Sequence, residues 1–122
     1  MVAFTAGATL SAAALNSAFN QVNVNAQTST SYTLALTDQG GLVTCDNTGA
    51  IALTIPPNSS VAFPVGTTIL VAALNTGQVT ITPGSGVTVN ATPGLKVRTR
   101  YSAATLVKLG TNSWLAMGDL SA

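Results

Sequence analysis

The four basic side chains of this 122-residue chain are Lys96, Arg98, Arg100 and Lys108, and all lie within thirteen positions. If residues 95–101 form a strand, the first three point to one face of it. Such a basic ridge could bind an anionic glycan or an acidic patch of another protein. It could also be a solvated face that protects a sheet edge, or pair with aspartates of another subunit. We favour these last two roles over a ligand site.

Three aromatic side chains could add a second kind of contact. Together Trp114, Tyr101 and Tyr32 could form a platform on which a sugar ring stacks. Single aromatics in strands more often anchor a core or an interface, and we favour that role for them. Because Trp114 lies beside a turn, it joins the four basic residues as a candidate contact for a ligand or partner.

Residues suited to reaction chemistry are scarce. The chain has no His and no Glu, and Asp38, Asp46 and Asp119 lie far apart, beside turn residues. General acid–base catalysis needs groups with tunable pKa values, and a metal site needs clustered ligands. Cys45, the only cysteine, is expected to be a small buried apolar residue. We therefore predict a protein that is not an enzyme and has no catalytic residue, metal site or cofactor.

The composition limits the partners of the chain. Only 6% of its residues are charged, whereas about 25% are charged in an average soluble domain. Such a surface has little electrostatic protection against association, so we predict a homo-oligomer; a hydrated monomer is the alternative. The net charge of +1 argues against nucleic acid. No apolar run reaches the ~18 residues that would span a membrane, and residues 1–5 lack the positive start of a signal peptide.

The elements that would position these residues are short strands. Apolar residues alternate in residues 51–55, which predicts a strand with one buried face. Pro56 and Pro57 then end the strand, because proline donates no backbone hydrogen bond. Residues 61–63 offer an apolar return before Pro64. The sequence thus predicts two strands joined by a rigid corner with prolines at both ends.

Similar runs recur along the chain. Further strands are predicted at residues 32–36, 42–45, 67–74, 79–81, 87–90, 95–101, 105–109 and 113–117. Residues 75–77 are predicted to turn a hairpin between two of them. About nine short strands with frequent turns are typical of an all-β sandwich or jelly roll. A trimeric β-prism would show the same pattern.

Residues 1–31 differ from the all-β domain predicted at residues 32–122. A short helix is predicted from a cap at Thr9 or Ser11 to Asn20, followed by the polar linker 23–31. Its apolar stripe consists of Leu15, Phe19 and Val22. A helix this short is marginal alone, so the stripe needs a partner. We predict that it docks on the β domain, on a symmetry mate or on another protein.

The β region also resembles a known family. The runs TLALTDQGGLVTCDNTGAIALTIPPNSSVAFPVGTTI, GQVTITPGSGVTV and GLKVRTRYSAATLVKLGTNSWLAMGDL resemble a β domain of tailed-bacteriophage structural proteins. That domain is found at the distal end of tail-fibre-like chains and in small virion proteins. The resemblance covers residues 32–120, and IPPNSSVAFPVGT is its most specific part. The opening FTAGATLSAAALNSAF resembles the N-terminal attachment segments of phage fibres.

The resemblance implies a place on the surface of the phage particle. It also implies a homotrimer that does attachment or scaffolding work without catalysis, with capsid, neck or tail proteins as partners. Unlike long fibres, this chain has no shaft, so we expect a short fibre or a capsid decoration protein. A receptor-binding module that recognises a host surface glycan is the alternative.

Overall fold

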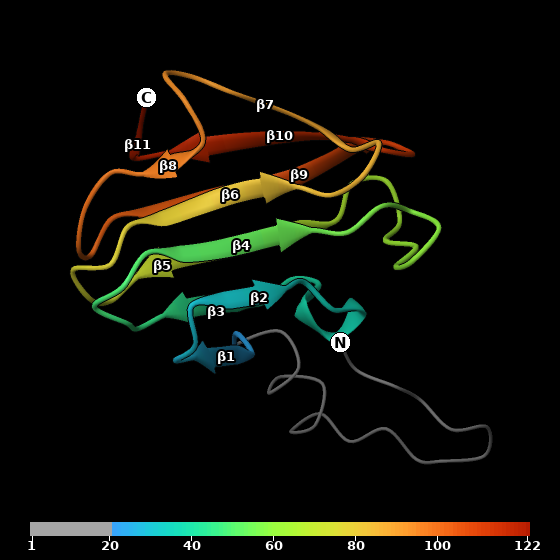
Figure 1. Ribbon diagram of the computed structural model, residues 1–122. Helices are drawn as coiled ribbons and strands as arrows, with labels where there is room; N and C mark the ends of the chain where they lie inside the picture. The colour runs from blue at the N-terminus through green and yellow to red at the C-terminus, as the bar shows by residue number, and fades with distance from the viewer. Residues whose placement is uncertain (1–20) are drawn as a thin grey trace, which may run out of the picture.

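In the computed structural model, which describes residues 21–122, the chain forms two β-sheets that pack face to face (Figure 1). One sheet has the strand order β1 (Val24–Gln27), β3 (Leu42–Cys45), β5 (Thr68–Ala73), β9 (Ala103–Gly110), β10 (Ser113–Gly118) and β7 (Thr88–Ala91). The other has the order β11 (Leu120–Ser121), β8 (Lys96–Val97), β6 (Val79–Pro83), β4 (Ile51–Ile55) and β2 (Ser31–Thr33). A single 3-10 turn, η1 (Leu36–Asp38), follows β2. The all-β prediction is confirmed.

The first six strands form a coil that crosses from one sheet to the other at every step. As a result β1, β3 and β5 pair in parallel, and so do β2, β4 and β6. The chain thus makes three stacked rungs, an arrangement like that of a β-solenoid. The connecting turns also stack: Asn47 Nδ2 donates to the Thr28 carbonyl (2.8 Å), and the Gly77 amide donates to the Asn47 carbonyl (2.9 Å). A Cβ on Gly77 would collide with the turn beneath it, which explains a glycine there.

The remaining strands cover one side of this stack. In the first sheet β9 runs antiparallel to β5, and β10 and β7 extend the sheet beyond it. In the second sheet β8 runs antiparallel to β6 and carries β11. The opposite side is formed by the first rung, β1 and β2. No strand within residues 21–122 pairs with the outer edge of this rung.

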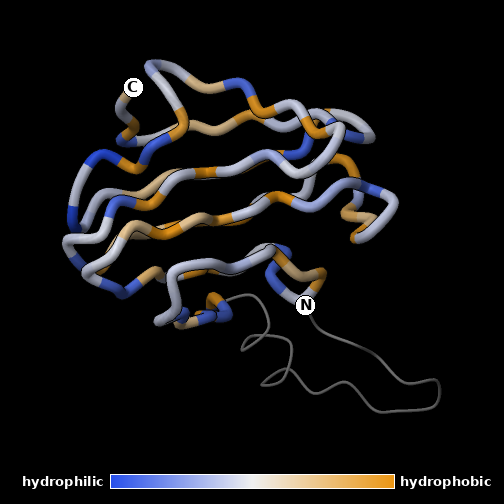
Figure 2. The backbone as a smooth tube through the Cα atoms, viewed as in Figure 1, coloured by the Kyte–Doolittle hydropathy of each residue, from blue (hydrophilic) through white to orange (hydrophobic). Residues whose placement is uncertain are grey.

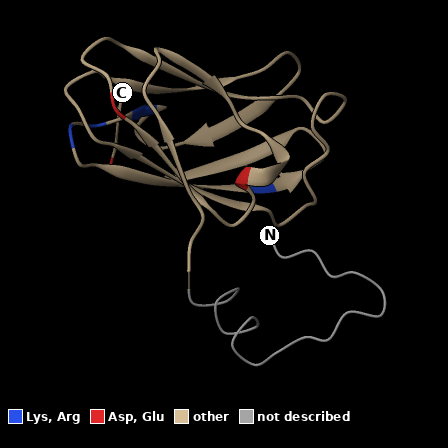
Figure 3. Ribbon diagram, turned by 90° about the horizontal axis from the view of Figure 1, so that it is seen from below, with Lys and Arg blue, Asp and Glu red and all other residues tan. Residues whose placement is uncertain are grey.

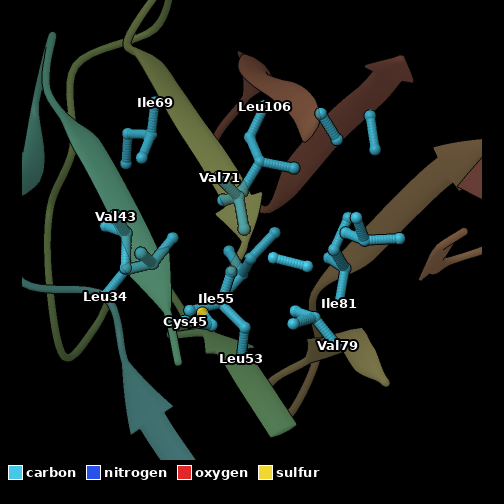
Figure 4. Close-up of a cluster of buried hydrophobic side chains, with 14 of the residues drawn as sticks. Leu34, Val43, Cys45, Leu53, Ile55, Ile69, Val71, Val79, Ile81 and Leu106 are labelled. Carbon is cyan, nitrogen blue, oxygen red and sulfur yellow. The ribbon is translucent and has the colours of Figure 1, made fainter. Parts of the chain in front are cut away.

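The core lies between the two sheets. Side chains such as Val43, Leu53, Val71, Ile81 and Leu106 are fully buried, and Figure 4 shows side chains of both sheets pointing toward one another. Figure 2 shows hydrophobic segments that alternate with paler ones along the strands, while hydrophilic segments lie mainly in the turns. Burial of each large aliphatic side chain contributes about 1.5–3 kcal/mol. The core is therefore the main source of stability.

The strand pairing differs from that of a jelly roll, and one local prediction, the hairpin, is wrong. The parallel ladders of the first three rungs replace the antiparallel pairing expected of a jelly roll. No hairpin forms at residues 75–77, because β5 and β6 belong to different sheets. Residues 61–63 lie in the predicted corner between β4 and β5, where the amides of Ser60 and Val61 both donate to the Pro57 carbonyl in a tight turn. Alternation indicates which face of a strand is buried, whereas the neighbour of each strand depends on contacts distant in sequence.

Only part of the predicted N-terminal segment lies within the described residues. The predicted helix, with Leu15 and Phe19, lies outside the described residues. Val22, the third residue of the stripe, is described and is 52% exposed. Part of the predicted linker forms β1, which pairs with β3 and belongs to the β domain. Between residues 21 and 122 there is no helix long and apolar enough to cross a membrane.

Candidate interaction surfaces

The turn that joins β8 to β9, residues 98–102, carries much of the surface charge. Figure 3 shows most of the charged positions at one end of the molecule, with others on the opposite side. The turn is held by backbone bonds from the Ser102 amide to the Thr99 carbonyl (3.0 Å) and from the Tyr101 amide to the Ala73 carbonyl (2.6 Å). Arg100 Nε adds a bond to the Leu74 carbonyl (3.2 Å). The turn is therefore fixed to the end of β5.

Asp119 fixes the same turn from the other side. Its carboxylate accepts two bonds from Arg98, Nε at 2.7 Å and Nη2 at 2.9 Å, and one from Ser102 Oγ at 2.6 Å. The hydrogen bonds from Arg98, then the one from Ser102, lower the pKa of Asp119 to about 2. Both ionic partners are about half exposed. Arg98 is thus paired within its own chain, and not with an aspartate of another subunit.

Tyr101 has an unusual backbone conformation. Its φ of 67° makes it the one non-glycine residue with positive φ in the described chain. It is the third residue of the turn closed by Ser102, a position where positive φ favours glycine. A bulky residue in this region is strained by about 1–3 kcal/mol. The side chain is nevertheless 71% exposed, and the Arg100 guanidinium carbon lies 4.9 Å from its ring centroid.

Lys108 does not belong to this surface. Its side chain is 2% exposed, and its ammonium donates to Asn58 Oδ1 and to the Phe63 carbonyl, both at 2.7 Å. The corner with prolines at both ends therefore folds over Lys108 and satisfies its charge with neutral acceptors. The sequence contained a signal for this. In β9 the side chain of Lys108 points to the same face as those of Ala104 and Leu106, which are buried, because residues two and four positions apart in a strand share a face.

The three aromatics do not form a platform. Trp114 is 1% exposed and packs edge-on against Phe63, with ring centroids 5.6 Å apart and planes at 88°. Trp114 is therefore a core anchor and contributes nothing to the surface. Tyr32 lies on β2, in the opposite sheet from Trp114, and Tyr101 lies in the exposed turn. Of the three, Tyr101 alone is available to a partner.

Asp38 organises a second polar cluster, beside the first rung. Its buried carboxylate accepts bonds from Asn25 Nδ2 (2.9 Å), the Tyr32 hydroxyl (2.7 Å) and the Ala35 amide (2.9 Å). Burial, then the hydrogen bond to Asp38, raises the pKa of Tyr32 to about 12. Because Asn25 lies on β1 and Tyr32 on β2, this cluster ties together both strands of the rung.

The other candidates for chemistry have structural roles. Asp46 accepts a bond from Asn75 Nδ2 at 2.9 Å between stacked turns. Cys45 is buried, and burial raises the pKa of its thiol to about 11, so the group is neutral near pH 7. Over residues 21–122 no three His, Cys, Asp or Glu side chains gather closely enough to hold a metal ion.

No protein-family model matches the chain, and no curated protein matches its sequence. Its role is therefore inferred from the chemistry and geometry of its own residues.

Proposed function

We propose that the protein is a non-enzymatic structural component of a tailed-phage virion. It assembles as a homotrimer and docks on capsid, neck or tail proteins at the particle surface, as a short fibre or a decoration protein. The resemblance of residues 32–120 supports this role. The low charge of the chain supports it too, since a surface with few charges suits permanent burial in an assembly.

The observation that carries the proposal is the absence of charge and of proline from the strands of the first rung. Strands β1 (VNAQ) and β2 (SYT) contain no charged residue and no proline, although each forms one edge of its sheet. Free edge strands normally carry such residues because an unprotected edge pairs with other chains. Terminal rungs of stacked folds also need a polar cap to remain soluble. An edge without charge or proline fits a surface that is covered in the working assembly.

Apolar side chains surround this edge. Val22 and Val24 are more than half exposed, and Leu36 is 46% exposed in the η1 turn. The chain enters β1 at Val24, shortly after residues 1–20, which carry two of the three residues of the predicted stripe, Leu15 and Phe19. The segment and the open rung are thus neighbours along the chain, and they would act as one attachment surface.

The test compares two exposed valines. Val24→Glu places a charge at the open rung, and Val65→Glu places one in the corner before β5, where the side chain is 66% exposed. Because neither side chain is buried, both variants should melt near the wild type. Both would be expressed during infection, and their occupancy on purified virions would be measured by quantitative mass spectrometry.

The proposal predicts that Val24→Glu is lost from particles while Val65→Glu is incorporated normally. Deletion of residues 1–20 should also abolish incorporation and leave a folded β domain, since all described strands lie beyond residue 20. Absence of the wild-type protein from virions would contradict the proposed role. Normal occupancy of both the Val24→Glu variant and the deletion would show that docking uses another surface.

A further inference from the structure

All solvent-exposed cationic side chains of the protein lie at one end. Lys96, Arg98 and Arg100 are exposed within five positions of one another, and Lys108, the fourth basic residue, is buried. Arg98 is already engaged by Asp119 in a bidentate pair. No hydrogen bond within residues 21–122 uses the Lys96 ammonium or either Nη of Arg100. Two cationic groups are thus free to bind an anion beside a fixed turn.

Tyr101 has no packing role that explains its conformation. A glycine would adopt its φ of 67° without strain, and glycines are found at the other positive-φ positions of the described chain. The tyrosine ring is 71% exposed, so burial does not compensate for the strain. Its contact is with Arg100, whose guanidinium lies over the ring. Backbone strain that holds an exposed ring in one place is typical of binding sites.

The turn is rigid enough to present this pair. Asp119 accepts hydrogen bonds from Arg98 and Ser102, which lie on both sides of Arg100 and Tyr101. The Tyr101 amide and Arg100 Nε are bonded to the carbonyls of Ala73 and Leu74. A ligand would therefore meet an arrangement that is already ordered, which lowers the entropy cost of binding.

The surroundings indicate the class of ligand. Thr99 of the same turn and Asp46, Asn75 and Thr76 of the neighbouring turns offer hydroxyl, amide and carboxylate groups. A protein partner would need roughly 800 Å² of surface on each side, with an apolar centre. A polyhydroxylated ligand needs an aromatic ring for its C–H face and polar groups for its hydroxyls.

We propose that Lys96, Arg100 and Tyr101 form a binding site for an acidic polysaccharide that carries carboxylated sugars. The sugar ring packs against the part of the Tyr101 ring that Arg100 leaves exposed, and its carboxylate binds the Nη groups of Arg100, with Lys96 adding positive charge at the same end. Arg98 and Asp119 are positioning residues that hold the turn. The site is separate from the open first rung, so it does not depend on the proposed virion role.

The experiment uses polygalacturonate as the probe, with neutral dextran and polyglutamate as comparison polymers. Binding to the full chain would be measured by biolayer interferometry at low and at physiological ionic strength. The variants are Tyr101→Gly and Arg100→Gln, and Val65→Gln is the control at an exposed position in another loop. The wild type should bind polygalacturonate in preference to both other polymers. Tyr101→Gly and Arg100→Gln should each weaken binding by about tenfold, and Val65→Gln should not.

Thermal melting separates binding from folding in the same samples. Glycine relieves the strain at position 101, so Tyr101→Gly should melt no lower than the wild type while it loses affinity. Each of three results would overturn the site. The first is that the wild type does not bind polygalacturonate, and the second is that Tyr101→Gly binds it with full affinity. The third is that the wild type binds polyglutamate equally well, which would indicate recognition of charge alone or an acidic peptide partner.

Discussion

Asp38 and Asp119 each organise a turn by accepting three hydrogen bonds, but their surroundings are opposite. Asp38 is 2% exposed and accepts from three neutral donors beside the first rung. Asp119 has a side chain that is 44% exposed and accepts from Arg98 and Ser102 at the charged end. Buried donors that lose their acceptor cannot form replacement hydrogen bonds with water, whereas exposed donors can. The buried Asp38 cluster should therefore stabilise the fold more than the exposed Arg98–Asp119 ion pair does.

Removal of the buried Asp38 carboxylate should have the largest effect on stability. Asp38→Ala leaves the Asn25 amide, the Tyr32 hydroxyl and the Ala35 amide without their acceptor, which should cost about 2–4 kcal/mol of folding free energy. Urea unfolding would measure the loss. Tyr32→Phe, which removes one of the three donors, should cost about 1 kcal/mol. A loss in Asp38→Ala no larger than in Tyr32→Phe would contradict the organising role of the carboxylate.

Alkaline pH should loosen the same region. The pKa of Tyr32 is raised from 10.0 to about 12, so the folded state favours the neutral phenol. The stability that this group contributes is present below pH 10 and is lost as the pH rises from 10 to about 12. Cys45 acts in the same direction between 9.0 and about 11. Thermal melting against pH should show this decline, and it should be smaller in Tyr32→Phe. An unchanged slope in Tyr32→Phe would assign the effect to Cys45 instead.

The exposed ion pair should have a smaller effect. The pKa of Asp119 is lowered from 3.8 to about 2, so its contribution is present above about pH 4 and is lost as the pH falls toward 2. Both partners are exposed and screened by salt, so Asp119→Asn should lower the melting midpoint much less than Asp38→Ala does. A midpoint drop in Asp119→Asn as large as that in Asp38→Ala would reverse the ranking of the two clusters.

Local alternation was enough to locate most strands from the sequence. Ile51, Leu53 and Ile55 all face the core as predicted, and Cys45 is buried as predicted. Pairing was not predictable in this way, because a period of two marks a face and does not distinguish parallel from antiparallel neighbours. The rungs depend on stacked turns such as those of Asn47 and Gly77, which are thirty positions apart.

The charged end was predicted only in part. The sequence located Lys96, Arg98 and Arg100 on one exposed surface, but the strand ends at Val97 and a turn carries both arginines. The pairing of Arg98 with Asp119 spans 21 positions and has no local signal. The positive φ of Tyr101 also has none, since the usual marker of that conformation is glycine.

The central claim is that the protein works as an assembly that covers its uncharged open rung. Multi-angle light scattering of the full chain at micromolar concentration tests it most directly. A homotrimer predicts a mass of three chains, and an interface of this permanence buries more than ~2,000 Å². A stable, folded monomer in the wild-type sample would contradict the account.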